Sequence, residues 1–442
     1  MNIHIIGAGV IGLSTAYALA WEGHRVTVLE AHAGAAQGAS FAPGGLISHL
    51  PPALWPAATR WRLGSRTAGF PSMPVPALNW PQRRWAGWRR QSHQAWLAAT
   101  TAEPAAGDLP AQENDSHAGD EPPPTPAPAQ ARPPAAATPP SDDSAAPLDL
   151  FQRLAQQLRL NHEDASGHLL LARSPAEATR LKTLGEQLQS RPELGLHTTW
   201  LDADALRTQE PGLNRDAVVV GALRLDADRV ANCRQMAMAL RAEAENLGVV
   251  FRFNTPVTRL ESRAGSTGWR LHLATGGAIE TEHVVLCAGA AARELLRPLG
   301  LRLPLQTAHA YTLTAAIREP LNAPRHAAVT EAGSQISVTR QGQRVRVTGA
   351  YRLGAHPPQH DAAAVQALYQ GLADAYPGAA VLSGSPQVWC ASVLMTPDDT
   401  PVVGPAGGHA GLWLNVGHGF RGWAQSLASA QAVTQMMTAT PR

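Results

Sequence analysis

The feature that most constrains this chain is its first thirty residues, which hold a glycine motif of the form G-x-G-x-x-G. An apolar run typical of a β-strand, Ile3–Ile6, precedes the motif, a helical pattern follows it, and a second apolar run ends at Glu30. This order of strand, turn, helix, strand and acid is that of a nucleotide-binding βαβ unit. The alternative is an accidental glycine-rich turn in another kind of α/β protein. Such a turn would not need a strand, a helix and an acid at these spacings, so their presence favours the nucleotide-binding unit.

Each part of the motif has a physical task. Gly7 permits the tight turn, Gly9 lets the backbone approach a pyrophosphate, and Gly12 lets the helix pack closely on the strand. The helix N-terminus offers free N–H groups and a positive dipole end to phosphates. Glu30 can accept hydrogen bonds from ribose hydroxyls. The motif therefore predicts a dinucleotide site, but it does not distinguish FAD from NAD.

Composition sets the outer limits of the interpretation. The chain has 442 residues, which suggests two or three domains, and a net charge of +2, so we expect no nucleic-acid partner. The N-terminus lacks a basic region before its apolar run, and no stretch of 18 or more residues is apolar, so we expect no signal peptide, no spanning helix and a cytoplasmic location. The cysteines have no metal-binding spacing, so we expect free thiols and no metal site: Cys233, Cys287 and Cys390.

The small net charge hides two segments of opposite character. Residues 51–102 carry seven Arg, six Trp and no acid, whereas residues 103–148 are rich in Pro and Ala and have a net charge of −7. Within the first segment, residues 76–98 predict a helix whose Trp side chains are either core or, alternatively, part of a basic surface for anionic lipid or nucleic acid. The second segment lacks large apolar residues and predicts a disordered insertion, with either no role or that of shielding the basic arm.

Three further glycine-containing turns follow apolar runs or loops. They are Gly44-Gly45, Ala288-Gly289 after a strand at 282–286, and Gly417-His418-Gly419 before the last helix. Backbone can approach a flat ligand closely at such turns. Between them, the patterns predict helices at 203–209, 228–247 and 361–375, and strands at 249–254, 269–274, 308–317 and 335–349.

Taken together, these segments resemble the FAD-dependent D-amino-acid oxidase superfamily and, more narrowly, the small-subunit type of D-amino acid dehydrogenase. The motifs keep the order of the family along the whole chain except residues 103–148. The segments that carry the resemblance are Ile3–Glu30, Ser40–Ala42 with Gly45, Leu201–Pro211, Phe251–Val257, Val284–Gly289, Met395–Asp398 with Thr400–Pro401, and Leu412–Trp423.

The resemblance implies an α/β fold with a discontinuous Rossmann-type FAD-binding domain and an antiparallel-sheet substrate domain. The implied boundaries are 1–50, 226–300 and 386–442 for the FAD-binding domain, 51–102, 149–225 and 301–385 for the substrate domain, and 103–148 for the insertion.

The same resemblance implies FAD as the cofactor. Glu30 would hold the adenosine ribose, Val257 would meet the adenine, and the helix before the C-terminus would direct its dipole at the reduced flavin. The other residues implied to line the cofactor are Gly7, Gly9, Val10, Ile11, Gly12, Ser40, Gly44, Gly45, Ala288, Gly289, Gly417, His418 and Gly419.

One departure from the family affects the substrate. Similar dehydrogenases carry an Arg before the Met395–Asp398 run that pairs with the substrate carboxylate, but Val393 stands there in this chain. A bidentate Arg–carboxylate pair is not easily replaced, so another cation must act or the substrate is not an ordinary α-amino acid. Arg352 and Arg421 are the candidate cations, and Tyr311, His49 and His418 are the other candidate catalytic residues. The resemblance also implies that some relatives attach the flavin covalently through a Cys in this region. Cys390 is displaced by one residue from that position, so we expect no covalent flavin bond here.

The sequence-based hypothesis is therefore an oxidoreductase that deaminates D-amino acids by hydride transfer from Cα to flavin N5. Electrons would pass to a quinone or another carrier, with the basic Trp/Arg arm as a peripheral contact to the inner face of the cell membrane. The alternatives are an oxidase that uses oxygen on amines, glycine or 2-hydroxy acids, and a flavin-binding protein without turnover.

Overall fold

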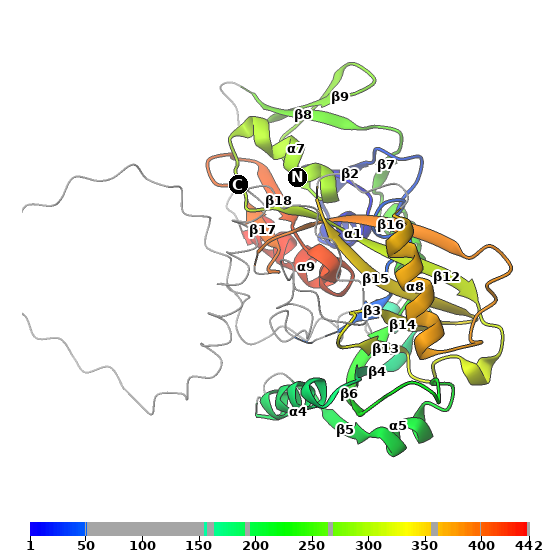
Figure 1. Ribbon diagram of the computed structural model, residues 1–442. Coiled ribbons are helices and arrows are strands. Elements are labelled where there is room, and N and C mark those ends of the chain that lie inside the picture. The colour runs from blue at the N-terminus through cyan, green and yellow to red at the C-terminus, as the bar shows by residue number, and fades with distance from the viewer. Residues whose placement is uncertain are drawn as a thin grey trace, which may run out of the picture.

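The computed structural model describes residues 1–48, 50, 154–156, 163–190, 195–263, 268–354, 361–397 and 399–439 (Figure 1). These residues form two large sheets and one small sheet. The expected helix at 76–98 and the expected disordered insertion at 103–148 lie outside the described residues. The domain boundaries stay a prediction.

The six-stranded sheet is the Rossmann-type unit that the opening motif predicts. Its strand order is β17-β18-β11-β1-β2-β7, and all neighbours are parallel except the pair β17 and β18. The bounds are β1 Asn2–Ile6, β2 Arg25–Leu29, β7 Val250–Arg252, β11 His283–Leu286, β17 Val402–Pro405 and β18 Leu412–Val416. Their carboxyl ends lie at one edge, where open parallel sheets bind ligands.

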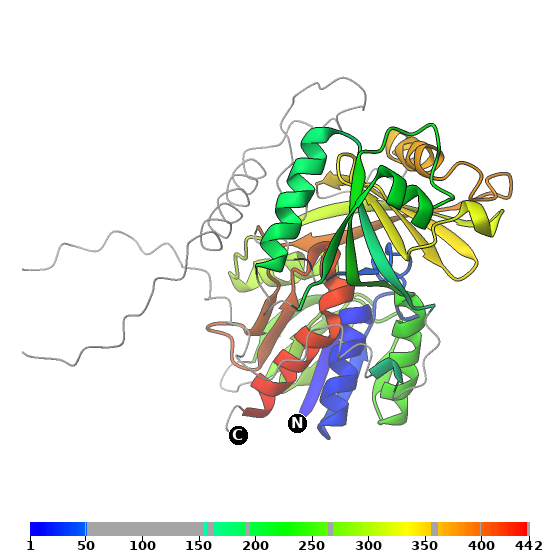
Figure 2. The same cartoon turned by 90° about the horizontal axis from the view of Figure 1, so that it is seen from below.

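Both faces of this sheet are covered, as a parallel sheet requires. Side chains such as Ile3, Ile5 and Val285 face a core shared with α1 Val10–Trp21, α6 Cys233–Asn246 and α9 Gly422–Ala439. Figure 2 shows these three helices side by side. The alternate side chains, such as Ile6 and Leu286, face α7 and the small sheet. The bounds on that side are β8 Val257–Ser262, β9 Trp269–Leu273, β10 Ala278–Thr281, η3 Gly289–Ala291, α7 Ala292–Leu296 and η4 Arg297–Leu299.

The nine-stranded sheet is mostly antiparallel and has the order β16-β12-β15-β14-β13-β4-β6-β3, with β5 also paired to β6. The helix α8 Ala362–Ala375 covers one face through a large apolar core, and α4 Pro175–Gln189 covers the end near β4 and β5. The strand bounds are β3 Leu46–Ile47, β4 Ala165–Ala172, β5 Thr198–Asp202, β6 Gly221–Val230, β12 Gln306–Ala316, β13 Ala328–Glu331, β14 Ser337–Gln341, β15 Arg344–Leu353 and β16 Gln387–Met395. The remaining elements are α5 Ala203–Gln209, η5 Pro320–Asn322 and η6 Gly419–Arg421.

The structure corrects two sequence-based boundaries. The helix predicted over 228–247 begins at Cys233, because residues up to Val230 complete β6 and the Asn232 side chain caps the helix by accepting a hydrogen bond from the Gln235 N–H. The single strand predicted over 335–349 is two antiparallel strands, β14 and β15, which turn at Gly342 with a φ of 56°. The helix α5 spans Ala203–Gln209, as predicted, and the Asp202 side chain caps it by accepting a hydrogen bond from the Ala205 N–H at 2.9 Å.

Candidate active site

A cavity of about 850 Å³ lies between the carboxyl ends of the parallel strands and one face of the nine-stranded sheet. The parallel sheet contributes residues that directly follow β1, β2, β11 and β18, and the other sheet contributes side chains of β12, β13, β14, β15 and β16. All the predicted cofactor residues line this cavity except Gly12. The four separate glycine turns of the sequence therefore converge on one space.

At one end of the cavity the Glu30 carboxylate is held in a fixed position. Its Oε2 atom accepts the Ala8 N–H at 2.6 Å, and its Oε1 atom accepts the His32 N–H at 2.9 Å. The His32 ring nitrogen Nδ1 also lies 2.6 Å from Oε1. The carboxylate is buried at the end of β2 beside the first glycine turn, and Val257 lines the same cavity. This is the position from which a carboxylate can bind ribose hydroxyls.

The backbone packing around the first glycine turn leaves no room for a Cβ atom at Gly7 or Gly12. Gly7 has a φ of 105°, and a Cβ at this residue would lie 2.6 Å from the Cys287 carbonyl oxygen. A Cβ at Gly12 would lie 1.9 Å from the Gly7 carbonyl oxygen, so Gly12 acts by packing and does not line the cavity. At Gly9 only the Ser40 hydroxyl lies within 4 Å of such a Cβ, and the cavity is on the open side.

The N-terminus of α1 carries no side-chain cap from its N-cap residue, Gly9. The Val10 N–H instead donates to the Ser40 Oγ at 3.0 Å, which links the turn to the loop that follows β2. Ile11 lines the cavity from the first turn of the same helix. A helix end of this kind presents N–H groups to an anion, so the arrangement fits a pyrophosphate.

The Gly44-Gly45 pair serves packing as well as the cavity. A Cβ at Gly45 would lie 2.1 Å from the Gln341 Nε2 atom, and the φ of Gly45 is 83°. The Gly44 carbonyl accepts hydrogen bonds from Thr339 Oγ1 at 3.0 Å and from Gln341 Nε2 at 3.1 Å. These glycines therefore tie the loop to β14 while they line the cavity.

The opposite end of the cavity is formed by the turn before α9. Gly417 and Gly419 have φ values of 86° and 56°, and His418 between them is 6% exposed. Burial lowers the pKa of His418 to about 3, so the imidazole is neutral at ordinary pH. Among the described residues its Nε2 atom has no hydrogen-bond partner. A buried, unpaired polar atom at the cavity wall is costly and fits a ligand with a polar edge.

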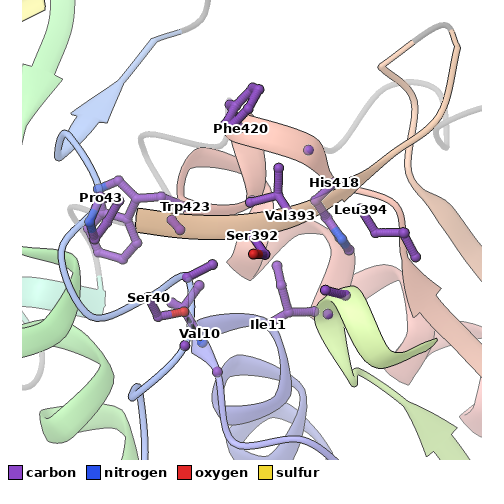
Figure 3. A pocket seen from close by; sticks show the side chains of 18 of the residues that line it. Val10, Ile11, Ser40, Pro43, Ser392, Val393, Leu394, His418, Phe420 and Trp423 are labelled. Atoms are coloured by element: carbon purple, nitrogen blue, oxygen red, sulfur yellow. Dashed lines mark hydrogen bonds between the residues drawn. The ribbon is translucent and has the colours of Figure 1, made fainter. Parts of the chain in front are cut away.

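Figure 3 shows the middle of the cavity. Ser392 on β16 points toward Ser40, Val10 and Ile11 across the space, and His418 lies at the same level. Val393, at the position where the resemblance implies an arginine, also lines the cavity. The cavity centre is therefore apolar at the point where the resemblance places a carboxylate-binding side chain.

The two candidate arginines occupy different places. Arg421 lines the cavity, and within the described part of the chain its guanidinium makes no hydrogen bond or ion pair. Burial lowers the Arg421 pKa, an effect that the carboxylates of Asp399 and Asp228 oppose. Arg352 does not line the cavity, because its Nε donates to Asp361 Oδ2 at 2.8 Å at the start of α8. Arg421 alone of the pair is placed to meet a ligand.

The expectation that Arg352 faces the pocket is wrong because the alternation of β15 breaks. Thr348 lines the cavity, so regular alternation would bring Arg352 to the same face. Instead, Ala350 has a φ of 50° and the pairing with β12 shifts register at this level, so that Tyr351 faces the cavity. Bulges of this kind re-aim side chains.

The expectation that Tyr311 lines the pocket is also wrong. Its neighbours Ala310 and Thr312 line the cavity, whereas Tyr311 is 1% exposed and lies in the core beneath α8. The remaining catalytic candidate, His49, lies outside the described residues.

Sequence reasoning missed a polar row on the sheet wall. Trp389, Thr312 and Thr348 are neighbours in register on β16, β12 and β15, and all three line the cavity. Within the described residues, the Trp389 Nε1 atom and the Oγ1 atoms of Thr312 and Thr348 are buried without hydrogen-bond partners. Because the three residues are far apart in sequence, only the strand register reveals the row.

Comparison with known proteins identifies the class of protein. The FAD dependent oxidoreductase family matches residues 2–436, so the chain belongs to this family. A D-amino acid dehydrogenase from Cereibacter sphaeroides is 31% identical over 446 residues, which cover 99% of this chain and 92% of the relative. A D-amino acid dehydrogenase from Rhizobium johnstonii is 28% identical over 452 residues, covering 99% and 96%. The predictions of the family and of an FAD-dependent oxidoreductase are confirmed.

Solved structures agree with the fold. Glycine oxidase from Geobacillus kaustophilus superposes with a TM-score of 0.70 at 18% identity, covering 100% of this chain and 96% of its own. L-α-glycerophosphate oxidase from Mycoplasma pneumoniae, solved with FAD bound, gives a TM-score of 0.67 at 14% identity, covering 99% and 95%. The predicted fold class is therefore confirmed, and the cavity walls described above fit FAD through the glycine turns, the fixed Glu30 carboxylate and the unpaired His418 nitrogen.

No group of three or more His, Cys, Asp or Glu side chains among the described residues is arranged to hold a metal ion. In the same residues, no helix has both the length and the apolar character that crossing a bilayer needs.

Proposed function

We propose that this oxidoreductase oxidises the C–N bond of a D-amino acid or of a similar secondary amine that bears a carboxylate. The names of the relatives support this substrate class, since those compared are D-amino acid dehydrogenases. FAD held by the glycine turns and Glu30 would supply a two-electron acceptor for a hydride from the substrate Cα. The imine product then hydrolyses in water.

The observation that carries the proposal is the position of Arg421. A cation within a partly buried cavity is costly unless an anion or hydrogen-bond acceptor meets it. Among the described residues the guanidinium makes no hydrogen bond or ion pair, and Asp399 and Asp228 act on it only through longer-range electrostatics. Arg421 lies three residues after His418 at the proposed flavin end of the cavity. A substrate carboxylate would complete a charge-assisted pair there. Arg421 would thus replace the arginine that is absent at Val393.

The cavity that Arg421 lines also offers apolar surface for an amino-acid side chain. Val393 and Leu394 of β16 line the cavity, together with Tyr351 and Phe420, whose ring centroids are 4.7 Å apart. His418 is neutral and adds no charge that would repel or attract the substrate carboxylate. The protein therefore supplies one cation, an apolar pocket and orientation, which are the contributions expected of a chain whose cofactor performs the redox step.

The fate of the electrons is part of the proposal. We infer a quinone or another carrier as acceptor, a cytoplasmic protein, and a peripheral contact of the Trp/Arg-rich residues 51–102 with the inner face of the membrane. That segment lies outside the described residues, so its sequence alone supports the contact.

Anaerobic mixing tests the proposal directly. The purified yellow protein is mixed with D- and L-amino acids, amines and 2-hydroxy acids while the flavin absorbance is followed. We expect D-amino acids to bleach the flavin and a dye to restore it. Bleaching by hydroxy acids alone, or by no compound, contradicts the proposal, and the second result would favour a flavin-binding protein without turnover. Rapid peroxide formation in air would favour the oxygen-using oxidase.

A further inference from the structure

A continuous chain of hydrogen bonds leads from the cavity into the nine-stranded sheet. The Ser337 Oγ lies 2.7 Å from Thr330 Oγ1, which lies 2.8 Å from His168 Nε2, and His168 Nδ1 lies 2.8 Å from Asp228 Oδ2. Ser337 and Thr330 line the cavity, whereas His168 and Asp228 are 0% and 1% exposed. One end of this chain is therefore accessible to a ligand, and the other end is a buried imidazole–carboxylate pair.

The four residues come from four strands, β14, β13, β4 and β6, which are consecutive in the sheet. Ser337 and Thr330 are directly opposite each other in register. On β4 the pairing with β6 shifts register between Ser166 and His168, at Gly167 with a φ of 90°. Residues 226–228 of β6 oppose the single residue Gly167 there, so the bulge lies on β6 and brings the Asp228 carboxylate to the His168 imidazole.

Hydrogen-bond chemistry fixes the direction of the chain when His168 is neutral. A carboxylate only accepts, so Nδ1 must carry the proton that Asp228 binds, and Nε2 must be an acceptor. Thr330 then donates to Nε2, and its oxygen accepts from the Ser337 hydroxyl. The Ser337 oxygen is left with lone pairs at the cavity wall, so the chain presents an acceptor to the ligand.

From this geometry we propose that Ser337, Thr330 and His168 form a relay that takes one proton from the substrate ammonium group before oxidation. The inference rests on the proposed function, since it requires an amine substrate. An N–H bond of the ammonium breaks and its proton goes to the Ser337 oxygen. The Ser337 proton goes to Thr330, and the Thr330 proton goes to His168 Nε2. The substrate keeps the electron pair as a neutral amine, and no oxidant takes part in the step.

The product of the relay is stabilised where it forms. An imidazolium at His168 would be a buried cation, and Asp228 lies in contact to neutralise it. Asp228 also raises the pKa of Arg421, so the same carboxylate acts on the relay and on the proposed carboxylate-binding arginine. A substrate whose carboxylate met Arg421 would carry its ammonium group in the same cavity as Ser337.

The charged groups near the relay include His326, whose ring lies against Gly167 and whose Nδ1 lies 2.6 Å from Glu210 Oε1. Asp228 on β6 contacts His168 directly, and its carboxylate also acts on Arg421 of η6, which lines the same cavity. On β13, Glu331 follows Thr330, but its carboxylate is held by Arg173 at 2.5 Å and by Ser334. A buried network with a merely structural role would have the same contacts, so the test must report on protons.

The kinetic test uses Thr330→Val, which keeps the shape of the side chain but removes the hydroxyl link. We expect the rate of flavin reduction by D-alanine under anaerobic conditions to fall about 100-fold at neutral pH, the range of general acid–base catalysis. The loss should shrink as the pH rises toward the pKa of the free substrate ammonium, because the amine then arrives neutral. Thr330→Ser should restore the wild-type rate and pH profile.

Thr312→Val is the matched control, because it removes a hydroxyl from the same wall that lies outside the relay. It should leave the shape of the pH profile as in the wild type. A loss in Thr330→Val that is equal at every pH, or a wild-type profile in that variant, would overturn the relay.

A second measurement is independent of turnover. The ¹⁵N shifts of the His168 imidazole in the holoenzyme, assigned with His168→Gln, report its tautomer. We expect the neutral Nδ1–H form in the neutral pH range; an Nε2–H form or a permanent imidazolium would overturn the relay. If no amino acid reduces the wild-type flavin, the proposed function fails. The His168 tautomer still decides, independently of turnover, whether the hydrogen bonds from Asp228 to Ser337 leave an acceptor at the cavity wall.

Discussion

The two ends of the cavity are built in different ways. The end near Glu30 is formed largely by one continuous segment, in which a strand, a glycine turn, a helix and a carboxylate follow within thirty residues. The sheet wall that faces the substrate takes single side chains from β12, β13, β14, β15 and β16 and a cation from the turn before α9. The first end holds a common nucleotide and can use a common motif. The second end must be specific, and its residues have no fixed spacing in the sequence.

The glycine turn should be the least tolerant part of the molecule. Gly12→Ala places a Cβ 1.9 Å from the Gly7 carbonyl oxygen, so helix and strand must separate. We expect loss of folded, yellow protein, seen as a lost thermal transition by circular dichroism.

Gly9→Ala is the matched control within the same motif, because only the Ser40 hydroxyl, at 3.4 Å, lies near the new Cβ. This variant should fold but bind FAD about tenfold more weakly, a loss of roughly 1.4 kcal/mol. A Gly12→Ala protein with wild-type stability would refute the packing role of Gly12.

On the substrate side, the two arginines provide the sharpest contrast. Arg421→Met should raise the Kd of a D-amino acid about 100-fold, because a hydrogen-bonded charge pair contributes about 2 to 3 kcal/mol. An amine with the same side chain but no carboxylate should bind equally to both proteins. Anaerobic titrations of flavin reduction give both constants.

Arg352→Met serves as the control, since Arg352 pairs with Asp361 outside the cavity. It should leave the ratio of the two Kd values unchanged. The assignment of Arg421 would be lost if Arg352→Met, and not Arg421→Met, abolished the preference for the carboxylate.

The His418 imidazole should make the flavin end sensitive to acid. Burial lowers its pKa from 6.5 to about 3, so above pH 6.5 neither the folded nor the unfolded form is protonated. Below 6.5 the unfolded chain binds a proton that the folded chain does not, and stability falls until about pH 3. The slope approaches about 1.4 kcal/mol per pH unit. Urea unfolding of apoprotein at several pH values should show a smaller slope for His418→Gln, and equal slopes would contradict the burial of a neutral imidazole.

The sequence could predict the nucleotide end because its signals are local. Gly7, Gly9 and Glu30 lie where their order in one βαβ unit requires, and Gly417 and Gly419 lie directly after a buried strand. The substrate wall depends on register instead. A positive φ at Ala350 turns Arg352 away from the cavity and brings Tyr351 in, and no composition rule anticipates it.

The relay was missed for the same reason. His168 is a single histidine within an apolar strand, and such a residue is usually an ordinary part of a core. Its partners Asp228 and Thr330 are distant in sequence, and only the pairing of β4 with β6 and β13 brings them together. Thr330 and Ser337 face the cavity from neighbouring strands, but alternation alone does not tell which face meets a ligand.

The central claim is that one FAD spans both ends, with its adenosine at Glu30 and its ring at the turn around His418. Equilibrium binding of FAD and of ADP to the apoprotein tests it most directly. We expect Glu30→Gln to weaken both ligands by a similar factor of about ten, and His418→Gln to weaken FAD but not ADP. An apoprotein that binds neither ligand, or a Glu30→Gln variant with wild-type affinity for both, would contradict the account.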